Sequence, residues 1–330
     1  MALWTRAELE TATEGQFLAA GDGDVFGISI DTRTLQPGDL FIALKGDSSD
    51  GHAHIATALE RGAAAVMVHD TTLCPTDPRI LQVADTMAGL QALGRAARAR
   101  FGGKVVAITG SVGKTTTKDM LRLCLAACGP THAAEASYNN HWGVPLTLAR
   151  LPRDAAFCIS EIGMNHPGEI LPLARMVRPD VAVITTIGSA HLGHMGSLDA
   201  TALEKASLIL ALPPGGTAIA PDDAHGLPMI IDAARKAHAT LWLAGAQAGS
   251  TARYNSVETG PEGSDFVVKL AGQSIAVRLG APGLHLVRNA LAALAACAAL
   301  GANTSSAAMA LRAFRPGKGR GAVSTVAQGQ

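Results

Sequence analysis

The chain has 330 residues, of which 48% are hydrophobic and 16% are charged, and its 27 Lys and Arg residues balance 27 Asp and Glu residues. A chain this long and apolar can bury a large core, which excludes an intrinsically disordered protein. A formal net charge of zero argues against a broad basic surface, so no nucleic-acid partner is expected. At about 150 residues per domain, the length predicts roughly two domains.

The N-terminal segment and the cysteines both indicate a cytoplasmic protein. Residues 1–15 carry several charged side chains and lack the apolar core of a signal peptide. The most apolar later stretch, residues 290–300, is too short to span a bilayer, so no membrane insertion is expected. The five cysteines form no Cys-x-x-Cys pair, which is typical of buried thiols in a reducing compartment. We expect a monomer.

Residues 1–102 are predicted to form a small mixed α/β domain. Short strand-like runs alternate there with turn residues and with two helical stretches. The expected strands are 25–30, 40–44, 64–68 and 80–83, and the expected helices are 52–60 and 85–100.

Residues 103–320 are predicted to form a larger domain with a mainly parallel sheet flanked by helices, because strands and helices alternate regularly. Two later strand patterns, 266–270 and 274–279, predict a hairpin with the three-residue loop 271–273. Residues 321–330 are expected to form a short tail. The other expected strands are 105–109, 157–161, 181–187, 217–220 and 240–244, and the expected helices are 114–127, 168–177, 199–212, 227–238, 287–300 and 305–314.

The strongest chemical signal is a glycine-bounded loop between the strand 105–109 and the helix that follows it. Glycines let backbone N–H groups turn inward, and a helix N-terminus offers further free donors, so the segment is typical of a triphosphate cradle. Lys114 would reach the outer phosphates, and Thr115 would place its hydroxyl on Mg²⁺. Ile108 stands where the strict Walker pattern needs glycine, so the loop is a shorter variant. The predicted cradle comprises Gly110, Ser111, Val112, Gly113, Lys114, Thr115 and Thr116.

Two further side chains are expected beside this loop, because ligands of open α/β sheets bind beyond the carboxyl ends of the strands. The strand 157–161 ends on Glu161, and His191 follows the strand 181–187. Carboxylates are preferred ligands of hard cations such as Mg²⁺, which also tolerate imidazole nitrogen. We therefore expect Glu161 and His191 at the metal site.

Four segments of the chain resemble the Mur ligases, and in particular the branch of that family that adds a dipeptide. They are residues 31–46, 109–117, 137–147 and 161–170, and the resemblance as a whole runs from about residue 25 to 321. It implies an ADP-forming amide ligase of peptidoglycan synthesis. ATP would phosphorylate the terminal carboxylate of a UDP-N-acetylmuramoyl-tripeptide, and the amine of D-alanyl-D-alanine would attack the acyl phosphate.

The resemblance also implies roles for single residues. Residues 1–102 would bind the UDP-muramoyl-peptide, and residues 103–320 would be a P-loop-type ATPase domain. Thr115 and Glu161 would hold one Mg²⁺, with His191 near the second. Lys205 matches a lysine that the family carbamylates to obtain an oxygen ligand for Mg²⁺. The substrate residues would be Thr32, Arg33, Asn139, Asn140, Asn165 and His166, and the further nucleotide residues Asn289 and Arg320.

Several positions depart from the family's pattern. Leu286 replaces the first asparagine of the adenine motif, Ser207 stands where an acidic residue commonly follows the carbamylated lysine, and Thr32 replaces a serine. No segment resembles the family's third, Rossmann-like domain, so we expect this chain to bind the UDP substrate and to ligate poorly. Two alternatives stay open: a Mur-type ligase with another amino-acid acceptor, and a non-catalytic remnant that binds nucleotide and UDP substrate.

Overall fold

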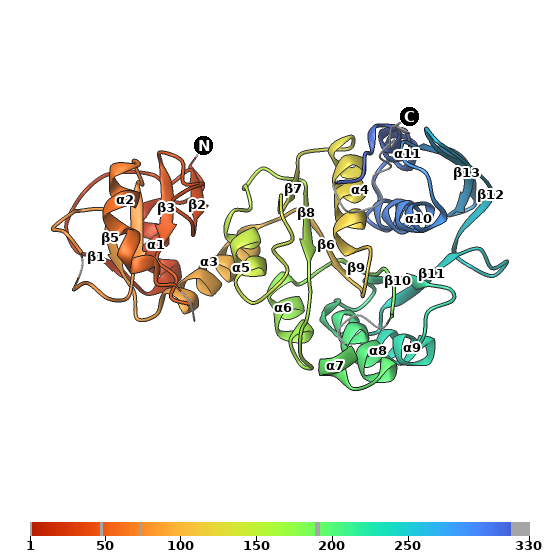
Figure 1. The fold of residues 1–330 in the computed structure, drawn as a ribbon, viewed down its shortest axis with the longest axis horizontal. Coiled ribbons are helices and arrows are strands. Elements are labelled where there is room, and N and C mark those ends of the chain that lie inside the picture. Colours follow the sequence, from red (N-terminus) through yellow and green to blue (C-terminus); the bar gives the residue numbers. More distant parts are fainter. Residues whose placement is uncertain (1, 47–48, 73, 189–191, 318–330) are drawn as a thin grey trace, which may run out of the picture. The chain divides into compact units, whose positions relative to one another are not determined.

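The computed structural model describes residues 2–317, apart from 47–48, 73 and 189–191. Contacts within the chain divide it into two compact units, which Figure 1 shows as ribbons. The first unit comprises residues 1–102 and 138–155, and the second comprises residues 103–137 and 156–330. The sequence placed residues 138–155 with the second part of the chain, but their apolar side chains pack into the core of the first unit.

The first unit is built on a five-stranded sheet with the strand order β1-β5-β4-β3-β2. The strands β2 to β5 pair in parallel, whereas β1 runs antiparallel to β5. The strands are β1 (Gln16–Phe17), β2 (Gly27–Ser29), β3 (Asp39–Ile42), β4 (Ala65–Val68) and β5 (Ile80–Gln82). The helices are α1 (Arg6–Thr13), the 3-10 helix η1 (Gly51–His54), α2 (Ile55–Glu60), α3 (Thr86–Arg100) and α5 (Gly143–Ala149).

Helix α5 joins the first unit although it follows the phosphate loop in sequence. Its Leu146 and Ala149 belong to the same buried cluster as Leu90 and Leu93 of α3. The indole Nε1 of Trp4 also donates to the carbonyl oxygen of Ala149 at 3.0 Å. These long-range contacts, which local sequence patterns do not reveal, explain why the first unit is discontinuous.

The second unit contains a nine-stranded sheet with the order β14-β13-β12-β11-β10-β9-β6-β8-β7. All neighbours from β7 to β12 are parallel, and only the β12–β13 and β13–β14 pairs are antiparallel. This confirms the expected α/β architecture of a small mixed sheet followed by a large, mainly parallel one. The strands are β6 (Lys104–Thr109), β7 (Thr131–Ala133), β8 (Phe157–Glu161), β9 (Val181–Ile184), β10 (Thr217–Pro221), β11 (Thr240–Gly245), β12 (Ala252–Gly260), β13 (Gly263–Leu270) and β14 (Gln273–Leu279).

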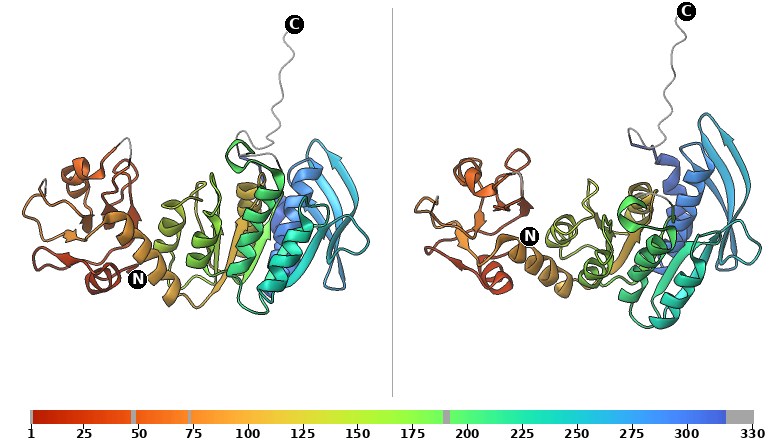
Figure 2. Two further views of the ribbon diagram at one scale, coloured as in Figure 1. Left: turned by 90° about the horizontal axis from the view of Figure 1, so that it is seen from below. Right: turned by 60° about the horizontal axis from the view of Figure 1, so that its bottom comes forward.

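Helices flank this sheet. Figure 2 shows α4 and α10 side by side, and the two helices are in contact and share one apolar core with the sheet. Helices α8 and α9 pack on each other on the other side of β9 to β11 in Figure 1. The helices are α4 (Lys114–Ala126), α6 (Ile170–Val177), α7 (Leu192–Met195), α8 (Leu198–Ala206), η2 (Ser207–Ala211), α9 (Leu227–Lys236), α10 (Leu284–Ala299), α11 (Thr304–Ala310) and η3 (Leu311–Ala313).

Two local expectations were wrong. The hairpin loop has two residues instead of three, because Leu270 pairs with Gln273, and Ala271 and Gly272 turn the chain with positive φ angles of 49° and 78°. The strand expected over 181–187 ends at Ile184. Just beyond that end, the backbone N–H of Thr185 still donates to the carbonyl oxygen of Thr109 at 2.9 Å, and its hydroxyl donates to the carbonyl oxygen of Val112 in the phosphate loop at 2.6 Å.

The helices of the described part of the chain are all too short or too polar to cross a membrane.

Candidate functional site

The glycine-bounded loop lies at the carboxyl end of β6, an interior strand of the large sheet between β8 and β9. Gly110 and Gly113 have φ angles of +152° and +89°, which L-residues with a side chain rarely adopt. A Cβ on Gly113 would also lie 2.8 Å from Asn289 Oδ1 on α10. The backbone conformation and the close approach of α10 therefore both require glycine at the predicted positions.

The segment after β9 holds the loop in place. Ser111 Oγ donates to the carbonyl oxygen of Gly188 at 3.0 Å and accepts from the N–H of the same residue at 2.9 Å. The N–H of Val112 donates to Thr186 Oγ1 at 3.1 Å. The loop is therefore pre-organised by side chains and backbone that follow the neighbouring strand, as a phosphate cradle needs to be.

Lys114 is the first residue of α4, and its ammonium is folded back onto the loop. Its Nζ donates to the carbonyl oxygen of Gly110 at 2.7 Å. Burial lowers the pKa of Lys114 below its ordinary value, and the negative charge of Glu161 partly offsets that effect. Lys114 is thus a half-buried lysine near the carboxylate of Glu161, and its ammonium contacts the glycine-bounded loop.

Oxygen atoms that suit a hard cation meet next to Lys114. Thr115 Oγ1 lies 3.1 Å from Glu161 Oε1 and 3.0 Å from Ser137 Oγ, and Glu161 is only 2% exposed. The described residues hold no cluster of three or more His, Cys, Asp or Glu side chains that could bind a metal ion. A cation here would therefore be shared between these oxygens and the phosphates of a nucleotide, which is how proteins usually hold Mg²⁺. The oxygens of Thr115, Ser137 and Glu161 therefore suit a Mg²⁺ ion that is bound together with a nucleotide.

The structure places the sequence-predicted Thr115 and Glu161 in direct contact. Ser137, which sequence reasoning missed, is the third residue of this group, because its hydroxyl contacts that of Thr115. Ser137 precedes the Tyr-Asn-Asn segment, and only its neighbourhood in that motif could have indicated it. Thr116 follows on the first turn of α4. His191 and Arg320 lie outside the described residues.

Lys205, the predicted target of carbamylation, is buried on α8. It is 2% exposed. Burial lowers its pKa to about 8, with a further lowering from the positive charge of Lys114 and an opposing effect from Glu204. A buried lysine with a lowered pKa has a large fraction of neutral, nucleophilic amine near neutral pH.

Glu204, which sequence reasoning missed, fixes the loop after β8. Its two carboxylate oxygens accept from the N–H groups of Gly168 and Ile170, both at 2.8 Å. This loop carries the predicted substrate residues Asn165 and His166, which are exposed. The signal for Glu204 was its position next to Lys205, but an acidic residue on a helix usually faces solvent.

A cavity of about 320 Å³ lies beyond the ends of β9, β10 and β11. Its wall includes Gly113 of the phosphate loop and Asn289 of α10, so a nucleotide bound at the loop could extend into it. Leu286, by contrast, is buried in the core cluster of the second unit. Two residues that sequence reasoning missed, Asp223 and Arg288, also line the cavity, and their side chains form an ion pair at 2.9 Å.

A second cavity, of about 820 Å³, belongs to the first unit. Thr32 and Arg33 line it as the sequence predicted for a substrate site, and Arg33 NH2 pairs with Asp31 Oδ2 at 2.6 Å. The hydrogen bond from Arg33 holds the pKa of Asp31 below its ordinary value. The remaining lining residues are Ile30, Asp31, Phe41, Leu44, Lys45, Gly46, Ser49, Gly51, His54, Met87, His141 and Trp142.

The predicted tripeptide residues are distributed over both units. Asn139 and Asn140 belong to the first unit, and Asn165 and His166 belong to the second. Asn140 Oδ1 accepts from the N–H of Gly143 at 2.9 Å, at the start of α5. His166 Nδ1 lies 3.2 Å from Glu169 Oε1.

Comparison with known proteins gives matches along most of the chain. The family model described as "Mur ligase middle domain" matches residues 108–297, and "Mur ligase family, catalytic domain" matches residues 24–99. A UDP-N-acetylmuramoyl-tripeptide–D-alanyl-D-alanine ligase of Synechocystis is 36% identical over 83% of this chain and 58% of its own length. The ligase of the same name from Bacillus subtilis is 34% identical over 88% of this chain and 62% of its own. The chain thus spans about three fifths of the length of these relatives.

Solved structures give the same result. A crystal structure of MurF from Acinetobacter baumannii is 34% identical, with a TM-score of 0.84, and the match covers 96% of this chain and 69% of that one. MurF ligase from Thermotoga maritima, solved in complex with ADP, is 25% identical, with a TM-score of 0.75 and coverage of 91% and 68%.

Proposed function

The chain belongs to the Mur ligase family, and from this membership we propose that it takes part in the ADP-forming joining of D-alanyl-D-alanine to a UDP-N-acetylmuramoyl-tripeptide. This reaction would make a peptidoglycan precursor in the cytoplasm. The names of the relatives and the ADP bound to a neighbouring structure support the proposal. The observation that carries it is the contact of Thr115 with Glu161 at 3.1 Å beside Lys114 at the phosphate loop.

The second unit is proposed to bind ATP. The N–H groups of residues 110–116 and the ammonium of Lys114 would hold the β- and γ-phosphates, and Asn289 would contact the adenine, with Arg320 also at the nucleotide. Thr115 and Glu161 would hold one Mg²⁺, and His191 would lie near a second. When bound, Mg²⁺ neutralises charge between the γ-phosphate and the substrate carboxylate.

The reaction needs two anions to approach each other, and the residues at the loop suit that task. An oxygen of the terminal tripeptide carboxylate would attack the γ-phosphorus, the bond to the β-phosphate oxygen would break, and ADP would leave. The amine of D-alanyl-D-alanine would then attack the acyl carbon and expel inorganic phosphate. Lys114 would offset the repulsion between carboxylate and phosphate by holding its positive charge between them.

The remaining residues are proposed to bind substrate. Thr32 and Arg33 would contact the UDP end in the cavity of the first unit, so residues 1–102 act as the UDP-muramoyl-peptide-binding domain and residues 103–320 as the ATP-binding domain. The tripeptide would be held by Asn139, Asn140, Asn165 and His166. Lys205, as a carbamate, would add an oxygen ligand for Mg²⁺.

The test is ATP-dependent formation of the UDP-N-acetylmuramoyl-pentapeptide, measured beside binding of ATP and of the UDP-tripeptide, with Lys114→Ala as the matched control. Product formed with D-alanyl-D-alanine but not with single amino acids would support the proposal. The second candidate function is binding without catalysis. It is favoured by Leu286, because this residue replaces an asparagine of the family's adenine motif and so removes one side-chain amide from the adenine site. It would be supported if both substrates bound and no product formed.

A further inference from the structure

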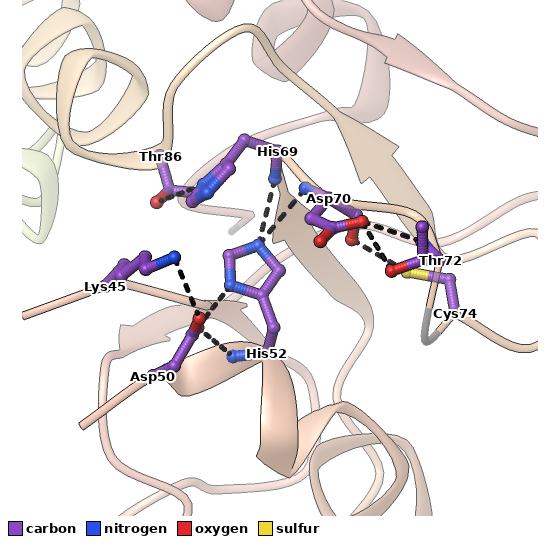
Figure 3. Close-up of polar contacts among 8 residues, drawn as sticks. All are labelled: Lys45, Asp50, His52, His69, Asp70, Thr72, Cys74 and Thr86. Carbon is purple, nitrogen blue, oxygen red and sulfur yellow. Dashed lines mark hydrogen bonds and ion pairs between the residues drawn. The ribbon is translucent and has the colours of Figure 1, made fainter.

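A buried histidine of the first unit connects three elements, and Figure 3 shows its polar contacts. It lies close to the cavity that Thr32 and Arg33 line. His52 lies in η1, just after the segment that leaves β3, and it is 4% exposed. It was not among the residues that the sequence singled out. Both of its ring nitrogens have partners, and these partners define its chemical state.

The hydrogen bonds of His52 fix one neutral tautomer. Its Nε2 accepts from the backbone N–H groups of His69 at 3.2 Å and Asp70 at 3.3 Å. Because a backbone N–H can only donate, the ring proton lies on Nδ1. This Nδ1–H donates to Asp50 Oδ1 at 2.6 Å.

Asp50 links His52 to a residue in the wall of the cavity. Its Oδ1 also accepts from the N–H of His52 at 3.0 Å, and its Oδ2 lies 3.8 Å from the ammonium of Lys45. Lys45 and Asp50 form an isolated antiparallel bridge, and the N–H of Gly51 donates to the carbonyl oxygen of Leu44 at 2.8 Å. Lys45 and Gly51 line the cavity together with Thr32 and Arg33.

The ring of His52 also packs against His69, which contacts a buried residue of α3. The rings of His52 and His69 meet edge to face with centroids 4.2 Å apart. His69 Nδ1 in turn lies 3.2 Å from Thr86 Oγ1, which is buried at the start of α3. His52 therefore connects the cavity wall to the end of β4 and, through His69, to α3.

Other chemical roles do not fit this arrangement. Neither ring nitrogen of His52 is available to a metal ion, and the part of the chain that the structure describes holds no cluster of three or more metal-ligating side chains. The nearby thiol of Cys74 is a poor nucleophile, since burial and the charge of Asp70 raise its pKa. The carboxylate of Asp70 is occupied by the N–H and hydroxyl of Thr72 at 2.9 and 2.7 Å.

We propose that His52 is a positioning residue for the UDP substrate: through Asp50 it holds Lys45 at the cavity wall, where Lys45 and Arg33 face the diphosphate. The inference rests on the proposed function, which assigns this cavity to the UDP end of the substrate. Lys45 is largely exposed, with 65% of its side chain accessible, so without the Asp50 carboxylate it would sample many rotamers. Ordering it before binding reduces the entropy that the substrate has to remove.

The experiment is a double-mutant cycle on the full chain, with binding of UDP-N-acetylmuramoyl-tripeptide followed by calorimetry. His52→Gln keeps an acceptor where Nε2 lies but loses the donor to Asp50, so we expect Kd to rise about tenfold. Lys45→Met should weaken binding by a similar factor, and the double variant should bind no more weakly than Lys45→Met alone. The Kd for ATP should stay unchanged in all three variants.

A merely structural role would give a different result. Misfolding would lower the fraction of binding-competent protein and leave Kd unchanged, and that outcome, or additive losses in the double variant, would overturn the inference. If His52→Gln does not fold, Asp50→Asn completes the same cycle with Lys45→Met, because its amide can still accept from His52 but no longer pairs with Lys45. Failure of the unaltered chain to bind the UDP-tripeptide would instead refute the proposed function.

Discussion

Lys205 should react with carbon dioxide at a much lower pH than an ordinary lysine does. Its pKa is lowered to about 8, mainly by burial. At about pH 7.5 a lysine of this pKa is about one quarter neutral, whereas one at the ordinary value is neutral in about one molecule in a thousand. Only the neutral amine attacks carbon dioxide, and the product is a carbamate and a proton. Lys205 thus offers roughly 200-fold more reactive amine than an exposed lysine.

The sign of each neighbour's effect can be tested separately. The positive charge of Lys114 lowers the pKa of Lys205, so Lys114→Met should raise that pKa and shift carbamylation to higher pH. Glu204 raises the pKa of Lys205, so Glu204→Gln should shift carbamylation to lower pH. Both shifts follow because the neutral, reactive amine of Lys205 forms as the pH rises through the pKa that Lys205 has in the folded protein.

The assay is ¹³C NMR of the protein equilibrated with ¹³C-labelled bicarbonate over about pH 6.5 to 9, the range that brackets this pKa. Lys205→Met is the control and should remove the carbamate signal. The reasoning would be refuted if the signal survived in that variant, or if it appeared only where exposed lysines react.

Three further changes test the site. Lys114→Ala should abolish ATP binding in a calorimetric titration, and unchanged nucleotide affinity would rule out the cradle. Gly113→Ala should weaken ATP binding at least about tenfold, because its Cβ would approach Asn289 Oδ1 and strain a backbone of positive φ; wild-type affinity would show that the loop adapts. Glu204→Ala should lower the free energy of unfolding in urea by about 2 kcal/mol, since the N–H groups of Gly168 and Ile170 lose a charged acceptor, and Glu204→Gln should lose less. An equal loss in both variants would contradict this.

The meeting of Glu161 with the phosphate loop could be predicted because it depends on local patterns and one rule of sheets. Apolar runs fix the strands β6 and β8, parallel pairing brings their carboxyl ends to one edge, and Glu161 is the last residue of β8. The close approach of Glu161 to Thr115 follows from that register. No knowledge of distant side chains is needed.

The membership of α5 in the first unit could not be predicted in this way. It depends on the packing of Leu146 and Ala149 against a helix more than forty residues earlier in the chain. The polar networks were equally hidden: Glu204 resembles any acidic residue on a helix, and His52 any histidine near a turn. Both side chains accept hydrogen bonds from backbone N–H groups, those of Gly168, Ile170, His69 and Asp70, and sequence patterns do not indicate which N–H groups a side chain will face.

The discontinuity of the first unit has a consequence for the order in which the protein folds during synthesis. When residue 102 has left the ribosome, α3 still exposes the apolar face that α5 later covers, and the indole N–H of Trp4 still lacks the carbonyl of Ala149. The phosphate loop and α4 are synthesised before that face can close. The nascent first unit therefore has to wait for residue 155 with an exposed hydrophobic surface, which is the kind of surface that chaperones bind.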